Sequence, residues 1–193
     1  MMVVFAITCW PPLLPEALKN FSAAYAIAFC AGVYFPTRMR WILPLTTLLI
    51  LDLGLNAYYA RTAGDFPILS VYTLFKVAAF GAIIWLGSRF KASNSWWKLL
   101  GGGLLGALLF YLITNTASWI FDPGYPKTLQ GLLQALTTGL PGLPPTWMFL
   151  KNTLISGGLF TGLFAGVMKM SEAAEEAEET EEENGEKPVP EEA

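Results

Sequence analysis

The chain has 193 residues, of which 54% are apolar and 14% charged, and its mean hydropathy is +0.47. Soluble domains of this size carry more charge and fewer apolar residues, so the composition excludes that class and predicts an integral membrane protein. The formal net charge of −3 hides an asymmetry, because eleven of the fifteen acidic residues follow Met170. Up to that point four acids stand against eleven bases, which predicts a basic membrane body with an acidic tail.

The chain contains no histidine, which removes the commonest general base and the commonest metal ligand together. Its two cysteines, Cys9 and Cys30, lack CxxC spacing and are predicted to be small buried side chains rather than redox or metal-binding groups. No nucleophile with an adjacent base is visible. We therefore expect no enzymatic activity, no cofactor and no metal site. The bases are dispersed at helix ends, so we expect no nucleic-acid partner.

Residues 1–10 are apolar but short, which predicts a half-length first helix rather than a cleaved signal peptide. PPLLP at 11–15 interrupts the chain. Longer apolar segments follow at 21–35, 41–59, 67–87, 96–121 and 146–170. The last four are long enough to cross ~30 Å of hydrocarbon, and the first is marginal. The pattern predicts an all-α, polytopic membrane bundle of five long helices plus the short N-terminal one.

The connection at 121–146 begins with a turn, DPGYP, and continues with leucines at helical spacing between Leu129 and Leu140. It predicts one external amphipathic helix, which would either close over the mouth of the bundle as a lid or lie inertly in the membrane interface. The glutamate-rich tail is expected to be disordered. The predicted domains are therefore a transmembrane body at 1–170 and a disordered acidic tail at 171–193.

Charge in the loops predicts the orientation. The segments 36–40 and 88–98, together with Lys169, hold six bases and no acid, whereas the loops expected on the opposite side are balanced. An excess of lysine and arginine marks the cytoplasmic side of a membrane protein. We therefore expect a multi-pass protein of the inner (plasma) membrane whose C-terminus is cytoplasmic and whose 121–146 connection lies outside.

Four of the apolar segments each carry a polar residue between five and nine residues from the predicted outer end of the helix, namely Asp52, Lys76, Asn115 and Lys151. An ionisable group inside the membrane is costly and suggests a functional site. Three pairs share a helix face by i, i+4 spacing: Asp52 with Asn56, Tyr72 with Lys76, and Asn115 with Trp119. The residues predicted to line one outward-facing ligand pocket are Asp52, Asn56, Tyr72, Lys76, Asn115, Trp119, Lys151 and Asn152. Alternatively, the two lysines extend to the membrane surface and Asp52 pairs with one of them.

In the predicted pocket the lysines face anionic or carbonyl groups of the ligand, and Asp52 faces a cationic group or one of the lysines. The asparagines donate and accept hydrogen bonds, and the two aromatic rings stack on the solute. Replacing Lys151 by Met is expected to abolish binding. The predicted function is binding of a small polar solute within the membrane, with lipid and solute as partners. The alternatives are a non-transporting accessory protein that works through its acidic tail, and a membrane enzyme.

Four stretches resemble an uncharacterised family of small bacterial membrane proteins, defined only as a domain of unknown function. They are FSAAYAIAFCAGVYF at 21–35, LPLTTLLILDL at 43–53, LGALLFYLITNTASWIFDPGYPKTLQGLLQAL at 105–136 and FLKNTLISGGLF at 149–160. The resemblance extends over 21–166, and the third stretch is its most specific part. It implies a bacterial inner-membrane protein. This chain departs from the family by its short first helix, by CWPPLLPEALKN at 9–20, and by lacking an acidic residue near Gly157.

In organisation that family is similar to the substrate-binding S components of energy-coupling-factor vitamin transporters. The similarity implies six helices, a ligand pocket near the outer face, and a separate module that hydrolyses ATP. This chain has no phosphate-binding GK[ST] motif after GGGLLG at 101–106, so ATP hydrolysis would have to come from such a partner. Those components carry a docking row of alanines on their first helix, and the corresponding helix expected here covers only residues 1–10.

Overall fold

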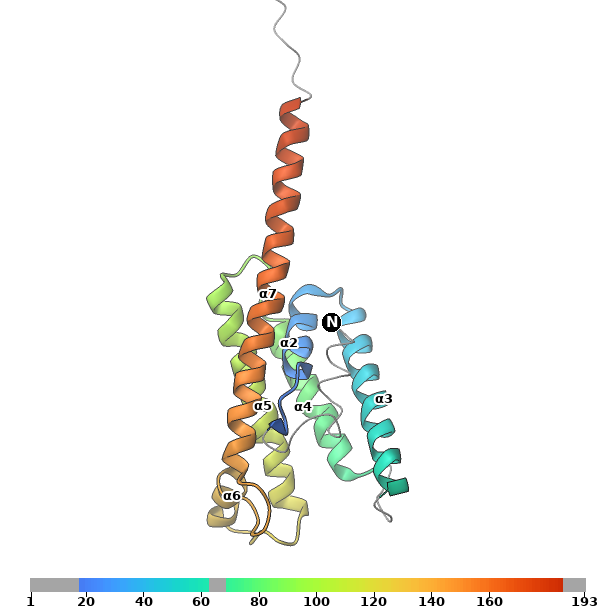
Figure 1. Ribbon diagram of the computed structural model, residues 1–193, viewed down its shortest axis with the longest axis vertical. Helices are drawn as coiled ribbons and strands as arrows, with labels where there is room; N and C mark the ends of the chain where they lie inside the picture. The colour runs from blue at the N-terminus through green and yellow to red at the C-terminus, as the bar shows by residue number, and fades with distance from the viewer. Residues whose placement is uncertain (1–17, 63–68, 186–193) are drawn as a thin grey trace, which may run out of the picture.

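The computed structural model describes residues 18–62 and 69–185, and within them the chain forms six α-helices and no strand (Figure 1). The prediction of an all-α bundle is confirmed for this part of the chain. The helix expected at 1–10 and the start of the segment expected at 67 lie outside it. The helices are α2 (Ala24–Tyr34), α3 (Met39–Thr62), α4 (Val71–Gly87), α5 (Trp96–Phe121), α6 (Leu129–Leu136) and α7 (Thr146–Gly185).

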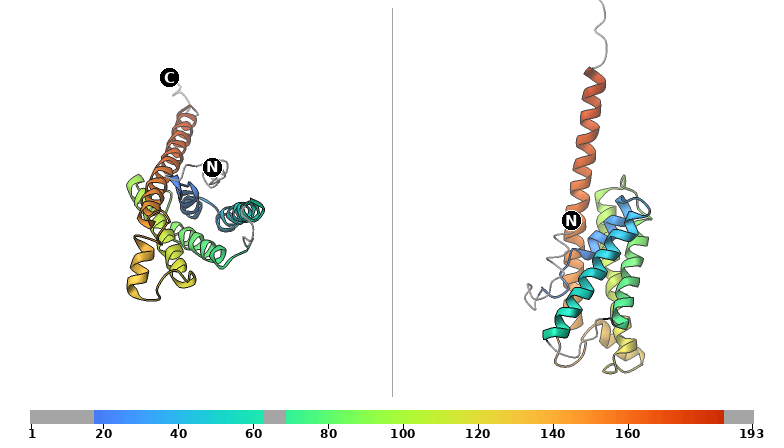
Figure 2. Two further views of the ribbon diagram at one scale, coloured as in Figure 1. Left: turned by 60° about the horizontal axis from the view of Figure 1, so that its bottom comes forward. Right: turned by 90° about the vertical axis from the view of Figure 1, so that its right-hand side faces the viewer.

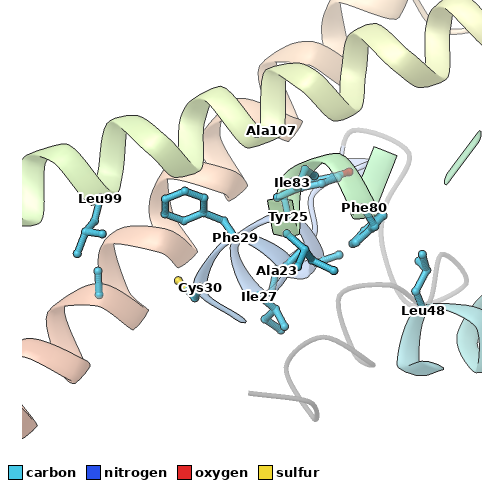
Figure 3. Close-up of a cluster of buried hydrophobic side chains, with 14 residues drawn as sticks. Ala23, Tyr25, Ile27, Phe29, Cys30, Leu48, Phe80, Ile83, Leu99 and Ala107 are labelled. Atoms are coloured by element: carbon cyan, nitrogen blue, oxygen red, sulfur yellow. The ribbon is translucent and has the colours of Figure 1, made fainter. Parts of the chain in front are cut away.

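Helix α2 forms the centre of the bundle and packs against α3, α4, α5 and α7 (Figures 1 and 2). Nine of its eleven residues are buried, including Cys30, which is a free thiol. Its Phe29 shares the core with Ile83 of α4 and Leu99 of α5, and all three are fully buried (Figure 3). The core therefore surrounds α2 on every side, rather than lying along one face of it.

Two close approaches hold the bundle together, and both need glycine. A Cβ added at Gly87 of α4 would lie 2.2 Å from the Phe29 carbonyl oxygen of α2. A Cβ added at Gly103 of α5 would lie 2.2 Å from Oγ1 of Thr161 on α7. Small residues let helix backbones approach closely where apolar lipid provides no hydrophobic drive for association. These contacts fix α4 against α2 and α5 against α7.

Within residues 18–62 and 69–185, three helices, α3, α5 and α7, are long and apolar enough to cross a membrane. The other two apolar helices are shorter, since α2 has 11 residues and α4 has 17. The expectation of five long spans therefore differs from the structure at these two helices. Helix α2 ends at Tyr34, and Phe35 is extended because Pro36 follows and the residue before a proline is disfavoured in helical conformation. The structure supports a membrane protein with three helices of spanning length.

The beginning of the acidic tail is helical, whereas the sequence predicted disorder from 171 onward. Helix α7 continues without interruption from its apolar part through Gly185 and projects beyond the rest of the bundle (Figure 2). Nucleating a helix is the costly step, and here the nucleus already exists in the packed part of α7. Alanine and glutamate then extend the helix at little cost. The last eight residues, 186–193, lie outside the described part of the chain.

The predicted amphipathic helix is present as α6, and it is shorter than its leucine pattern. It ends at Leu136, and the chain then turns through Gly139, whose φ of 73° suits glycine. Figure 1 shows α6 at one end of the bundle and the α2–α3 turn and α4–α5 loop at the other, where α7 projects. Lys169 of α7 donates a hydrogen bond to the Ala92 carbonyl in that α4–α5 loop, 3.3 Å away. The base-rich loops therefore share one end, as the sequence predicts.

Candidate functional site

A buried carboxylate joins α3 to α4. Asp52 of α3 is only 7% exposed, and its Oδ1 forms an ion pair with Lys76 Nζ of α4. The other oxygen, Oδ2, accepts hydrogen bonds from Thr73 Oγ1 at 2.8 Å and from Asn56 Nδ2 at 3.4 Å. The spacing explains the meeting, because Asn56 lies one helical turn after Asp52 and Thr73 lies one turn before Lys76. The carboxylate thus receives three donors inside an apolar bundle.

The two charges of this pair differ in their access to solvent. The side chain of Asp52 is 6% exposed, whereas that of Lys76 is 36% exposed. An ammonium group has three hydrogens, and one of them faces Asp52. Lys76 therefore keeps donor capacity on its exposed side, while the positive charge it carries there is balanced by the carboxylate behind it.

Lys76 forms part of the wall of a cavity between α4 and α5. The cavity has a volume of about 280 Å³ and combines aromatic, hydroxyl and amide side chains. It lies toward the beginning of α4 and the end of α5, which is the end of the bundle away from the acidic projection of α7 (Figure 1). The residues lining it are Asn20, Tyr72, Phe75, Lys76, Phe110, Thr114, Asn115, Ala117 and Ser118.

The polar groups of α5 in this wall already use donor hydrogens inside their own helix. Thr114 Oγ1 donates to the Phe110 carbonyl at 2.8 Å, and Ser118 Oγ donates to the Thr114 carbonyl at 3.2 Å. Asn115 Nδ2 donates to the Tyr111 carbonyl at 2.8 Å. A hydroxyl has one hydrogen and two lone pairs, and an amide oxygen only accepts. The α5 side of the cavity therefore offers mainly hydrogen-bond acceptors, opposite the donor Lys76.

The structure brings some of the predicted site residues together. Tyr72, Lys76 and Asn115 line the cavity, and Asp52 and Asn56 lie directly behind Lys76. This arrangement contains both alternatives from the sequence, since Asp52 pairs with a lysine and the same lysine lines a cavity.

Three predicted residues lie elsewhere. Lys151 is exposed and is not part of the cavity wall. Asn152 is 4% exposed, and its Nδ2 donates to the Lys19 carbonyl at 2.9 Å, which anchors the chain ahead of α2 to α7. Trp119 Nε1 donates to the Pro126 carbonyl at 2.9 Å and so holds the turn after α5. The structure does not bring these three side chains to the cavity.

Several cavity residues were missed from the sequence, although some carried a signal. Thr114 is adjacent to Asn115, and Ser118 lies four residues further along the same helix, so both could have been found by extending the helical face. Thr73, which bonds Asp52, lies three residues before Lys76 and could have been found in the same way. Phe75 and Phe110 carried no such signal, because phenylalanine is as common facing lipid as facing a cavity.

The lid and interfacial alternatives for α6 can be compared with its position. Tyr111 OH of α5 donates to the Leu136 carbonyl at 2.5 Å, and Gly131 and Ala135 are the buried residues of the helix. Leu129 and Leu133, one turn apart, are exposed. None of the residues lining the cavity belongs to α6. The helix therefore lies along the end of α5 with a leucine face outward, and it does not form a wall of this cavity.

Comparison with known proteins identifies a family. The profile of a family described as a family of unknown function (DUF6580) matches residues 1–179. No curated protein and no solved structure matches the chain. The expectation of an uncharacterised family is thereby confirmed over nearly the whole chain.

Proposed function

Since the chain belongs to the DUF6580 family, whose function is unknown, we propose from its own residues that it binds a small polar solute inside the membrane. The observation that carries this proposal is the cavity of about 280 Å³ with Lys76 in its wall and the buried Asp52 carboxylate behind it. Small-molecule sites are concave and largely apolar, with a few placed polar groups. This cavity fits that description, and its volume lies just below the usual range of roughly 300–1,000 Å³.

The buried ion pair supports a binding role over a purely structural one. Well-packed apolar side chains stabilise a protein interior as well as a buried ion pair does, or better, so stability alone does not account for a buried pair at this position. Ionisable groups within transmembrane segments commonly mark solute or ion pathways. Here the lysine of the pair lines a cavity instead of being enclosed by apolar neighbours, so its ammonium group could contact a ligand.

We further propose that the cavity opens to the outside of a bacterial inner membrane. This proposal is supported by the position of the basic residues, which are concentrated at the end of the bundle opposite the cavity. By the preference of lysine and arginine for cytoplasmic loops, the acidic projection of α7 would then be cytoplasmic. The bases at that end are Arg38, Arg40, Arg89, Lys91, Lys98 and Lys169.

Uptake of the bound solute is the simplest use of such a site. The apolar helices, the outward cavity and the lack of a GK[ST] phosphate loop match the organisation of S components, which depend on a separate ATP-hydrolysing module. By this proposal the chain supplies solute recognition, and a partner supplies energy. This part rests on organisation alone, so it is an analogy at the level of the fold.

Thermal stabilisation of the purified protein in detergent tests the binding. Vitamins, nucleobases, amino acids and metal ions form the panel. A ligand present at a hundredfold its Kd stabilises the folded state by about 2.7 kcal/mol, which raises the melting temperature measurably. Asn115→Leu removes an acceptor from the cavity wall without leaving a charge unpaired, so it should abolish the shift. Lys151→Met is the matched control, since Lys151 is exposed outside the cavity, and it should bind like the wild type.

Deletion of 171–193 separates this proposal from the accessory-protein alternative. A solute-binding protein should keep its ligand-induced shift without the tail, because the cavity lies at the other end of the bundle. No shift across the panel, in protein that unfolds cooperatively, would refute solute binding. It would favour a role in which the acidic part of α7 contacts another protein.

A further inference from the structure

The cavity wall also restricts which solutes it can accept, an inference that depends on the proposed binding function. Among the lining residues that belong to the described ranges 18–62 and 69–185, Lys76 is the one that carries a charge, and Asp52 balances that charge. The remaining polar groups in the wall belong to asparagine, threonine, serine and tyrosine. The described part of the wall therefore has donors and acceptors but almost no net charge.

From this wall we infer that the ligand is an uncharged, flat ring compound with a carbonyl acceptor on one edge and an N–H donor on another, as in a lactam or a carboxamide. The carbonyl would face Lys76, which keeps ammonium hydrogens on its exposed side. The N–H would face α5, where Thr114, Asn115 and Ser118 present lone pairs after using donor hydrogens on their own helix. Each edge of such a ligand thus meets the complementary group.

The aromatic residues account for the flat shape. Phe75 of α4 and Phe110 of α5 line the cavity together with Tyr72. Each phenylalanine ring also contacts another ring: the centroid of Phe110 lies 4.8 Å from that of Tyr25, and the centroid of Phe75 lies 5.4 Å from that of Phe121. Rings fixed in this way form firm walls for a planar ligand, because aromatic pairs prefer stacked or edge-on contact.

The buried negative charge of Asp52 explains why the cavity should exclude acidic ligands. A ligand carboxylate at Lys76 would have to give up its own hydration and would lie close to Asp52, which carries the same charge and is nearly inaccessible to solvent. Drawing Lys76 toward the ligand would in turn leave Asp52 buried with only two neutral donors. Breaking a buried pair in this way is strongly unfavourable. A neutral carbonyl accepts a hydrogen bond from Lys76 without either consequence.

Matched pairs of compounds that differ in one charged group test this inference. Uracil is compared with orotate, and benzamide with benzoate, by thermal shift and by titration calorimetry on the full-length protein in detergent. We expect the neutral member of at least one pair to bind, and its acid to bind at least about tenfold more weakly. 1,3-Dimethyluracil, which has no N–H donor, should also bind more weakly than uracil.

The variant Asp52→Asn tests the cause of the preference. It keeps the size of the side chain and removes the balancing charge, so the cavity becomes positive and the ratio should shift toward the acid by about tenfold or more. Lys151→Met, outside the cavity, should keep the wild-type ratio. An unchanged ratio of the two affinities in folded Asp52→Asn would overturn the charge argument. If that variant does not fold, the comparison of neutral and acidic compounds on the wild-type protein still tests the inferred ligand class.

Three outcomes overturn the inference and differ in what they say of the proposed function. If the wild type binds the acid as tightly as its neutral partner, solute binding stands and the ligand class is wrong. The second outcome is that none of the ring compounds binds, whereas a charged or aliphatic solute of the wider panel binds to the wild type and not to Asn115→Leu. In that case too, solute binding stands and the ligand class is wrong. If no compound of either panel binds, the proposed function and the inference fail together.

Discussion

The ion pair between Asp52 and Lys76 leads to a prediction about stability that needs no ligand. Lys76→Met leaves the Asp52 carboxylate buried, with only the neutral donors Thr73 and Asn56. Breaking a fully buried pair costs about 3–5 kcal/mol. Because the Lys76 side chain is 36% exposed, part of its interaction is already screened by solvent, so we expect the low end, about 3 kcal/mol.

The reverse substitution acts by a different route. Asp52→Leu removes the acceptor of Thr73 and Asn56, which are 3% and 6% exposed. The Thr73 hydroxyl then loses its buried acceptor, which costs about 1–3 kcal/mol, and Asn56 loses one hydrogen bond, which costs about 1 kcal/mol, so this variant should also lose about 3 kcal/mol. The double variant, Asp52→Leu with Lys76→Met, contains no unpaired carboxylate. Its loss should stay near 3 kcal/mol, well short of the sum, which implies a coupling energy of about 3 kcal/mol.

Unfolding in mixed micelles by titration with dodecyl sulfate, followed by the fluorescence of the seven tryptophans, measures the free energy of unfolding for all four proteins. Lys151→Met serves as the control for loss of a lysine and should unfold like the wild type. Losses that simply add in the double variant would refute the reasoning, because they would mean that the two side chains do not interact. A Lys76→Met variant as stable as the wild type would refute it equally.

Three further predictions concern the packing and the loops. Gly87→Ala should destabilise the fold by about 1–3 kcal/mol, since its Cβ would meet a backbone oxygen at 2.2 Å, whereas Gly54→Ala, with nothing within 4 Å, should be neutral or stabilising in the same titration. Tyr111→Phe should cost about 1 kcal/mol by removing the hydrogen bond to α6, and hydrogen exchange in α6 should become faster. Burial, and then the charge of Asp122, raise the pKa of Tyr125 above its ordinary value of 10.0, so the native state holds this proton more tightly than the unfolded state. Stability should therefore fall as the pH rises beyond 10.0, and the melting temperature of Tyr125→Phe should fall less over the same range.

The polar residues show how much of the candidate site could be predicted from the sequence. Asp52, Asn56 and Lys76 could be predicted to meet because their depth and their helical spacing both follow from position along the chain. The sequence could not show which of Lys151 and Asn152 is buried, because hydropathy identifies an apolar segment and does not show how its helix is rotated about its own axis. Neighbours on a helix point about 100° apart, so one of the two faces outward while the other is buried. Only the contacts of α7 with α5 and α2 decide which.

The lengths of the helices show the same limit. The segment at 21–35 is apolar throughout, and the sequence could not reveal that its helix is surrounded by protein instead of lipid, since both surroundings favour the same residues. The acidic tail was misjudged for a related reason. Its composition is typical of disorder for an isolated segment, but residues 171–185 continue a helix that is already formed.

The enclosed position of α2 has a consequence for how the protein enters the membrane. An 11-residue helix is only about 16 Å long, and a bilayer core is about 30 Å thick, so α2 cannot insert as an independent span. The helices that surround it, α3, α4, α5 and α7, are all synthesised later. During biogenesis α2 therefore cannot reach its final position until α7 has been synthesised and the bundle can close around it. Before that point α2 must lie shallow in the membrane or stay bound to the insertion machinery. Assembly of this protein should accordingly be completed only after translation has passed α7.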